Sequence, residues 1–317
     1  METMMAMPHT PLRESTDRAP VIRLDGANDA DVKVSYEFFP AKTEKAEAAL
    51  WDAVKRLEIL QPSYVSVTYG AGGTTQERTL GTVARMVRET SLTPAAHLTC
   101  VGASCATIDA VADELWEAGV RSIVALRGDP QSGFGGRYEP HPEGYPYAPE
   151  LIEGLKKRHD FEVFCSAYPE RHPESPDWQT ELDVLRRKSD AGASKAITQF
   201  FFEADIFFRF RDRVADAGID IDIVPGVMLQ PNVEGLSRMA NAVGVAVPDW
   251  YRRLFEGLED DLPTRQMLTA SVATDLCAEL YDGGVRDFHL YTLNRADIAI
   301  AVSRALGEAH ARIRHRE

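Results

Sequence analysis

Short runs of β-branched and aromatic residues alternate along the chain with stretches whose apolar residues recur at helical spacing. Runs of this composition, bounded by turn-forming residues, predict β-strands. Eight candidate strands span residues 32–39, 64–70, 95–100, 122–128, 162–169, 195–202, 222–229 and 288–294. The alternation indicates an α/β protein.

The intervening stretches predict helices by their 3.6-residue period. Residues 44–58, 106–118 and 204–216 each place apolar side chains on one face, as Leu50, Val54 and Leu57 do in the first. Four helical stretches end in an acidic residue, a small residue and a glycine just before a strand. Glycine there predicts a helix end, because it adopts the left-handed conformation without strain. These endings lie at residues 117–119, 190–192, 216–218 and 282–284.

Eight strand–helix units in one chain favour a (β/α)8 TIM barrel, which occupies about 250 residues. A doubly wound sheet is the alternative. It is weakened because the glycine clusters at 70–73 and 133–136 do not complete the G-x-G-x-x-G phosphate fingerprint. We expect a single catalytic barrel over residues 31–317, preceded by a partly disordered N-terminal extension over residues 1–30.

Composition limits the binding partners and the cellular location that we expect for the protein. The chain has 317 residues and a net charge of −14, which argues against broad binding to nucleic acid or to an anionic membrane surface. No apolar run approaches the roughly 20 residues of a membrane helix, and the first residues do not form a signal peptide. The four cysteines match no zinc pattern, so we expect no metal site and a cytoplasmic protein.

Polar residues near the strand ends supply the candidate chemistry. Because alternate residues of a strand point to opposite sides, residues of one parity share a face, and barrel sites gather at the carboxyl ends of strands. The polar positions that share a parity are Ser35, Glu37, Ser66, Thr68, His97, Thr99, Arg127, Asp129, Ser166, Tyr168, Gln199, His289 and Tyr291, with Arg295 following the last strand. Structural interpretations remain open: Glu37 as an ion-pair partner, His97 as a core histidine, and Arg127 and Asp129 paired with each other or with a neighbouring loop.

Ten ordered segments carry a resemblance to a known family. They include VSYEFFPAKT, YVSVTYGAGG, IVALRGDP, AYPERHPE, ITQFFFE and DFHLYTLNRA, and they extend from about residue 31 to residue 308. The chain resembles methylenetetrahydrofolate reductase of the bacterial, single-domain type. The resemblance implies a barrel that holds FAD non-covalently. It also implies reduction of 5,10-methylenetetrahydrofolate to 5-methyltetrahydrofolate by NADH or NADPH, which feeds one-carbon metabolism and methionine synthesis.

The resemblance also implies roles for individual residues. Glu37 resembles the general acid that protonates folate N10, and burial among aromatic residues would raise its pKa toward neutrality. Asp129 resembles an aspartate beside the flavin and the pterin, where a negative charge stabilises a developing cation. Gln199 and Arg295 resemble folate-binding residues, and Thr68 and Tyr291 are expected to complete the substrate site.

The expected flavin contacts combine cations with small and aromatic residues. They are Thr68, His97, Arg127, Gly128, Asp129, Tyr168, His172, Glu181 and Lys188. Two of the relevant positions depart from the family pattern. Glu181 stands where relatives often have aspartate. Val233 stands where relatives often have an aromatic residue that stacks on the nicotinamide and the folate, so the choice between NADH and NADPH stays open.

A ping-pong reaction at one pocket is the expected mechanism, because the strand ends offer a single polar cluster. Two alternatives remain: another FAD-dependent barrel that resembles proline dehydrogenase, and a folate-binding barrel without redox activity. The expected partners are the folate and the nicotinamide nucleotide, with no nucleic acid and no membrane. We also expect a homo-oligomer, as is frequent in this family.

Overall fold

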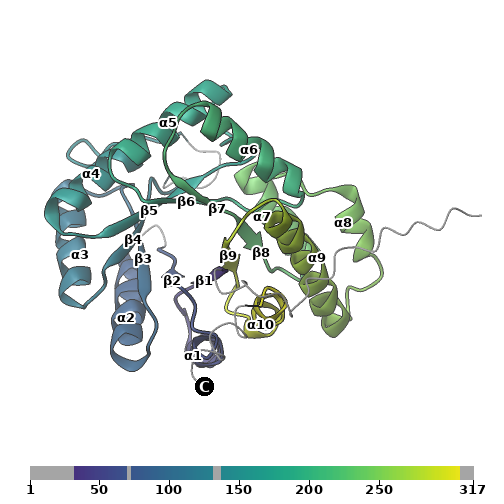
Figure 1. Cartoon of the computed structure of the whole chain (residues 1–317). Coiled ribbons are helices and arrows are strands. Elements are labelled where there is room, and N and C mark those ends of the chain that lie inside the picture. Colours follow the sequence, from purple (N-terminus) through teal and green to yellow (C-terminus); the bar gives the residue numbers. More distant parts are fainter. Residues whose placement is uncertain (1–31, 70–72, 131–136, 308–317) are drawn as a thin grey trace, which may run out of the picture.

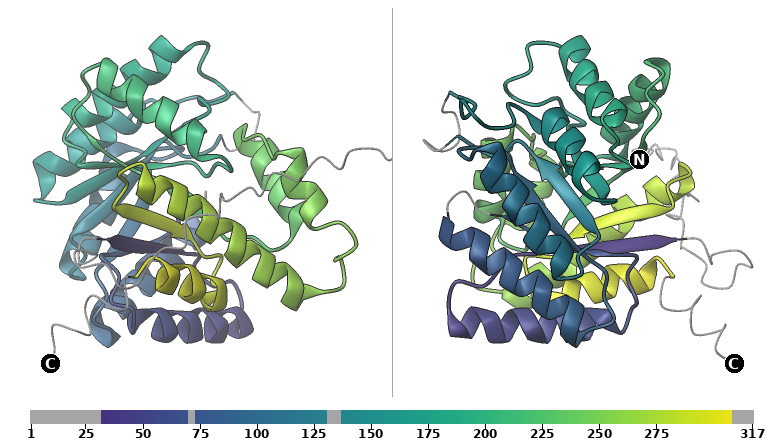
Figure 2. Two further views of the ribbon diagram at one scale, coloured as in Figure 1. Left: turned by 45° about the vertical axis from the view of Figure 1, so that its right-hand side comes forward. Right: turned by 90° about the vertical axis from the view of Figure 1, so that its left-hand side faces the viewer.

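A parallel β-sheet forms the centre of the molecule, and helices surround it (Figures 1 and 2). The computed structural model describes residues 32–69, 73–130 and 137–307, so the expected N-terminal extension lies outside the described residues. The sheet order is β7-β6-β5-β4-β3-β2-β1-β9-β8. The strands are β1 (Lys33–Phe38), β2 (Val65–Val67), β3 (Pro94–Thr99), β4 (Ser122–Leu126), β5 (Glu162–Ala167), β6 (Lys195–Thr198), β7 (Asp222–Val224), β8 (Gly226–Met228) and β9 (Asp287–Tyr291).

The sheet closes at Pro225, which separates β7 from β8. β7 pairs with β6, whereas β8 pairs with β9 at the other end of the strand order. Proline has no backbone N–H for the sheet hydrogen bonds, but the Pro225 carbonyl oxygen accepts from the backbone N–H of His289 at 3.0 Å. The seventh expected strand therefore exists as two short pieces with different neighbours. The (β/α)8 barrel is confirmed, and the sequential strand order excludes a doubly wound sheet.

Helices cover the outside of the sheet and connect successive strands (Figure 2). They are α1 (Glu44–Glu58), α2 (Gly73–Glu89), α3 (Cys105–Glu117), α4 (Ala148–Arg158), α5 (Trp178–Asp190), α6 (Ala204–Asp216), α7 (Val233–Val243), α8 (Asp249–Leu254), α9 (Leu262–Asp282) and α10 (Ala296–Ala305). The three helices expected over 44–58, 106–118 and 204–216 match α1, α3 and α6 within one residue. None of the helices in the described ranges is long and apolar enough to cross a membrane.

Local sequence explains where these helices begin and end. The side chains of Thr43 and Asp177 accept hydrogen bonds from the first turns of α1 and α5, which satisfies backbone donors that lack a helical partner. The predicted glycine endings are confirmed by positive φ angles of 91°, 108°, 65° and 94° at Gly119, Gly192, Gly218 and Gly284.

Alternate residues of each strand face two different regions, the layer between the sheet and the helices and the inside of the barrel. Val34, Tyr36 and Phe38 of β1 are fully buried and belong to the main apolar cluster with residues of α1 and α10. Ser35 and Glu37, of the other parity, are also buried. Tyr64, Phe164 and neighbouring apolar residues form a smaller separate cluster. The polar parity therefore lies inside the barrel and leads to the carboxyl ends of the strands.

Candidate active site

Two adjoining cavities open at the carboxyl ends of the strands. The first, with a volume of about 470 Å³, extends from Arg127 to Lys188 and is called the Lys188 cavity. The second, of about 460 Å³, lies over Glu37 and is called the Glu37 cavity. Residues that line both cavities are Tyr69, Leu126, Asp129, Ser166 and Tyr168. The shared lining makes one compound site from β1 to α5.

Glu37 stands in the second cavity between two histidines. Its Oε2 lies 3.5 Å from His97 Nε2 and 3.8 Å from His289 Nε2. All three residues are buried, with 7%, 7% and 0% of their surface exposed. Burial lowers the pKa of His97 to about 4, and the neighbouring Glu37 opposes this shift only in part. Glu37 therefore faces a neutral imidazole at physiological pH.

Pairing of β1 with β9 explains how these groups meet. The register sets Ser35 opposite His289 and Glu37 opposite Tyr291, and all four share the inward parity. His289 was among the polar strand positions in the sequence, but neither it nor Ser35 was assigned a role there. The signal was the shared parity with Glu37, which marks residues of neighbouring strands that face the same interior.

The expected folate-binding residues Thr68, Gln199 and Tyr291 all line the Glu37 cavity. The Tyr291 hydroxyl donates to the Thr198 carbonyl oxygen at 2.7 Å, which fixes its ring against the cavity. The Gln199 side-chain carbonyl accepts from the Phe200 backbone nitrogen at 3.1 Å. Much of the remaining wall is apolar, with Phe39, Phe200, Met228, Met239, Val243 and Leu293. A few polar groups in an apolar wall suit a flat heterocycle.

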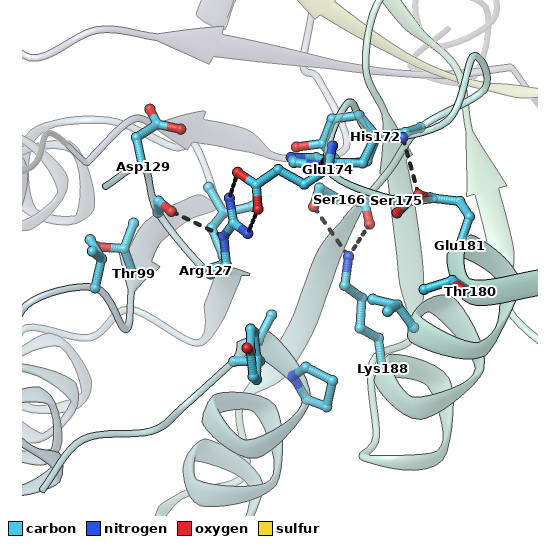
Figure 3. Close-up of a pocket in the computed structure, with 18 of the residues that line it drawn as sticks. Thr99, Arg127, Asp129, Ser166, His172, Glu174, Ser175, Thr180, Glu181 and Lys188 are labelled. Atoms are coloured by element: carbon cyan, nitrogen blue, oxygen red, sulfur yellow. Dashed lines mark hydrogen bonds and ion pairs between the residues drawn. The ribbon is translucent and has the colours of Figure 1, made fainter. Parts of the chain in front are cut away.

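Two cations stand in the Lys188 cavity (Figure 3). Lys188 is buried and its Nζ donates to the carbonyl oxygen and the hydroxyl of Ser166 at 2.7 and 3.3 Å. Arg127 forms a bidentate pair with Glu174 at 2.5 and 2.9 Å. Both oxygens that hold Lys188 are neutral, so the charge of this buried ammonium group is available to an anionic ligand.

Glu181 is held by the loop before α5. Its Oε2 accepts from the Ser175 hydroxyl at 2.6 Å and from the His172 backbone nitrogen at 3.0 Å. The carboxylate therefore fixes the loop that carries His172, whose ring packs edge-on against Tyr168 at 4.7 Å. Glu181, His172 and Tyr168 all line the Lys188 cavity.

Asp129 lines both cavities and follows a turn that only glycine accommodates. Gly128 has φ = 83°, and a Cβ atom there would lie 2.5 Å from Val101 Cγ1 and 2.9 Å from Thr99 Cβ. Partial desolvation raises the pKa of Asp129, while Arg127 and His172 oppose that rise. Arg127 pairs with Glu174 of the loop before α5 and forms no ion pair with Asp129 among the described residues, so the neighbouring loop is the partner of Arg127.

Arg295 and Val233 lie apart from the two cavities. Arg295 is the N-cap residue of α10 and lines neither cavity, so its contact with the folate stays a prediction. Val233 begins α7 and lines a third cavity of about 350 Å³ with Phe255, Arg252 and Arg265. Most of the expected site is therefore compact, and these two positions are exceptions.

A closed parallel barrel with buried acid–base groups at its carboxyl end is the arrangement of a TIM-barrel enzyme. Comparison with known proteins defines which one. Residues 23–307 match the family model for methylenetetrahydrofolate reductase. The chain belongs to this family and is an oxidoreductase.

Similar proteins cover nearly the same length. The 5,10-methylenetetrahydrofolate reductase of Pectobacterium carotovorum is 44% identical over 279 residues, which are 87% of this chain and 90% of that protein. The enzyme of the same name from Escherichia coli K12 is 43% identical over 276 residues, 87% and 91% of the two chains. A solved Clostridium thermocellum protein, described as binding two copies of 5-methyl-5,6,7,8-tetrahydrofolic acid, shares the fold with a TM-score of 0.59 and 14% identity, over 89% and 96% of the chains.

Proposed function

We propose that this chain reduces 5,10-methylenetetrahydrofolate to 5-methyltetrahydrofolate, with FAD as cofactor and NADH or NADPH as reductant. The observation that carries this proposal is the adjacency of the two cavities. A buried carboxyl group flanked by imidazoles lies in one, and cations line the other. Membership of the family supports the folate as substrate. The two cavities support separate places for the folate and for the cofactor.

The residues of the Lys188 cavity fit an anionic dinucleotide. The buried Lys188 ammonium group has only neutral oxygens as its hydrogen-bond partners, so a diphosphate would supply the missing negative charge. The residues that would hold FAD are Arg127, Gly128, Asp129, Tyr168, His172, Glu181 and Lys188 of this cavity, with Thr68 and His97 of the adjoining Glu37 cavity. When bound, FAD supplies the hydride chemistry that links the nicotinamide nucleotide to the folate.

Glu37 and Asp129 would act on the folate. Glu37 donates its proton to folate N10, which opens the five-membered ring and leaves a cationic iminium. The Asp129 carboxylate, at the boundary of the two cavities, stabilises that cation. Gln199, Tyr291 and Thr68 hold the pterin in the Glu37 cavity, and Arg295 holds the polar tail of the folate. The nicotinamide nucleotide and the folate use this cavity in turn, which gives a ping-pong reaction.

Flavin spectroscopy tests the proposal. Purified protein with FAD should show the flavin absorbance bands, lose them on anaerobic mixing with NADH or NADPH, and regain them with 5,10-methylenetetrahydrofolate. Flavin that is reduced but not reoxidised by the folate would favour another FAD-dependent barrel, such as one that resembles proline dehydrogenase. Folate binding without any flavin band would favour a redox-inactive folate-binding barrel.

A further inference from the structure

His289 has an unusual environment for a histidine that lies wholly inside the barrel. None of its surface is exposed, and its Nε2 has no hydrogen-bond partner among the described residues. His97 Nε2 is in the same condition. Buried polar atoms are nearly always paired, so two such nitrogens next to each other call for an explanation. Both face the same atom, Glu37 Oε2, at 3.8 and 3.5 Å.

The opposite ring nitrogen of His289 is held by Ser35. Ser35 Oγ donates to the Phe288 carbonyl oxygen at 3.2 Å and lies 2.8 Å from His289 Nδ1. The Tyr64 hydroxyl lies 3.5 Å from the same Nδ1. When the single hydroxyl hydrogen of Ser35 stays on the Phe288 carbonyl oxygen, Nδ1–H is the donor to Ser35. That arrangement is the neutral tautomer of His289 with its proton on Nδ1. The Nε2 atom then presents a lone pair to Glu37.

We propose that His289 is a positioning residue for Glu37, whose Nε2 lone pair accepts the hydrogen bond of the protonated carboxyl group and retains the proton there until the folate binds. The proposal rests on the function proposed above. A carboxylate facing this lone pair would be repelled, whereas the carboxylic acid finds an acceptor. Binding of the folate would shorten contacts that are long in the free protein.

The other groups around Glu37 are also compatible with a neutral acid. Those that face it are His97 on β3, His289 and Tyr291 on β9, and Tyr64 before β2. Burial raises the pKa of both tyrosines and lowers that of His97, so all three are neutral at physiological pH. The Lys195–Asp287 pair, at 2.6 Å, lies at the amino ends of β6 and β9. Glu37 is at the carboxyl end of β1, so this pair does not face it.

The proton balance is simple. When Glu37 acts, its O–H bond breaks, an N–H bond forms at folate N10, and a carboxylate remains. His289 keeps its Nδ1 proton throughout. A proton from solvent restores the acid after the folate leaves, and the His289 lone pair again accepts its hydrogen bond.

The protonation state of His289 can be measured without turnover. Nitrogen-15 NMR of the whole protein, with histidine labelled and His289 assigned by its loss in His289→Gln, distinguishes the two neutral tautomers from imidazolium. We expect the Nδ1–H tautomer from pH 6 to pH 8. An Nε2–H tautomer or an imidazolium in this range would overturn the proposal, even if folate reduction is confirmed.

Ser35→Ala supplies a kinetic test. Without the serine acceptor, His289 is free to carry its proton on Nε2 and donate to the carboxylate, which stabilises the ionised form of Glu37. The folate half-reaction requires the acid form of Glu37, so its rate falls as the pH rises. In Ser35→Ala the midpoint of this fall should lie about one pH unit lower than in the wild type. Flavin reduction by the nucleotide should keep its pH profile.

Ser303→Ala is the matched control. Ser303 is equally buried and its hydroxyl lies 2.8 Å from Tyr36 OH, on the other face of β1. This variant loses a similar hydrogen bond without altering the contacts of His289. The midpoint pH of the folate half-reaction should therefore equal that of the wild type. An equal shift in both variants, or no shift in Ser35→Ala, would refute the positioning role. A wild-type protein that binds flavin but never reduces the folate would refute the proposed function instead.

Discussion

The ammonium nitrogen of Lys188 lies 2.7 Å from the carbonyl oxygen of Ser166, so a buried cation on α5 is fastened to the end of β5. Ser166 also lines both cavities. The contact therefore positions a positive charge at the edge of the compound site. Because α5 packs on the sheet and the Lys188 Nζ bonds the Ser166 carbonyl oxygen, the position of this charge is fixed.

Replacement of Lys188 by methionine should weaken FAD binding. The variant keeps the length and packing of the side chain but removes a charge-assisted contact worth about 1.5–3 kcal/mol, so the dissociation constant should rise about 10- to 100-fold. Quenching of flavin fluorescence on titration measures it. Lys157→Met, which removes an exposed lysine that pairs with Glu153 on α4, should bind FAD like the wild type. Equal affinity in all three proteins would exclude Lys188 from the cofactor site.

Glu37→Gln should separate the two half-reactions. The amide cannot donate an acidic proton, so the folate half-reaction should slow by a factor on the order of 10²–10⁴. Flavin reduction by NADH or NADPH should proceed at close to the wild-type rate. Stopped-flow absorbance of each half-reaction provides the comparison. Full folate reduction by the variant would mean that another group supplies the proton.

Gly128→Ala should destabilise the protein and disturb Asp129. A side chain at φ = 83° is strained, and its Cβ would meet Val101 and Thr99 at less than 3 Å, so we expect a loss of about 1–3 kcal/mol in unfolding free energy. Gly81→Ala in α2 is the matched control, because its Cβ would meet nothing within 4 Å. It should be neutral or stabilising by up to about 1 kcal/mol. Urea denaturation measures both, and equal effects would contradict the assigned strain.

His97 should make stability depend on pH. Its pKa is about 4 in the folded protein and near 6.5 when unfolded, so the unfolded chain binds one more proton between these values. Stability should therefore rise with pH across this window, by up to about 3 kcal/mol in total, because each pH unit within it contributes about 1.4 kcal/mol. His97→Gln should lack this component of the slope. Denaturation at pH 4, 5, 6 and 7 tests it, and identical slopes in the two proteins would contradict the buried neutral state.

The period-two pattern predicted the strands and the inward parity that unites Glu37, His97 and Tyr291, because a strand alternates its sides whatever surrounds it. Side-chain partners could not be predicted in the same way. Arg127 pairs with Glu174, 47 positions along the chain, since the loop before α5 folds back over β4. The division of the seventh strand at Pro225 also depends on which strands close the barrel. Arg295 lines neither cavity, so its contact with the folate stays a prediction from the resemblance.

The exchange of strand partners at Pro225 has a consequence for behaviour in concentrated solution. An open sheet exposes backbone donors and acceptors along its outermost strands, where a second chain can add and begin an aggregate. Here β7 and β8 use those groups on β6 and β9, so the two ends of the strand order meet. The same junction that completes the barrel thus removes a template for intermolecular β-sheet growth.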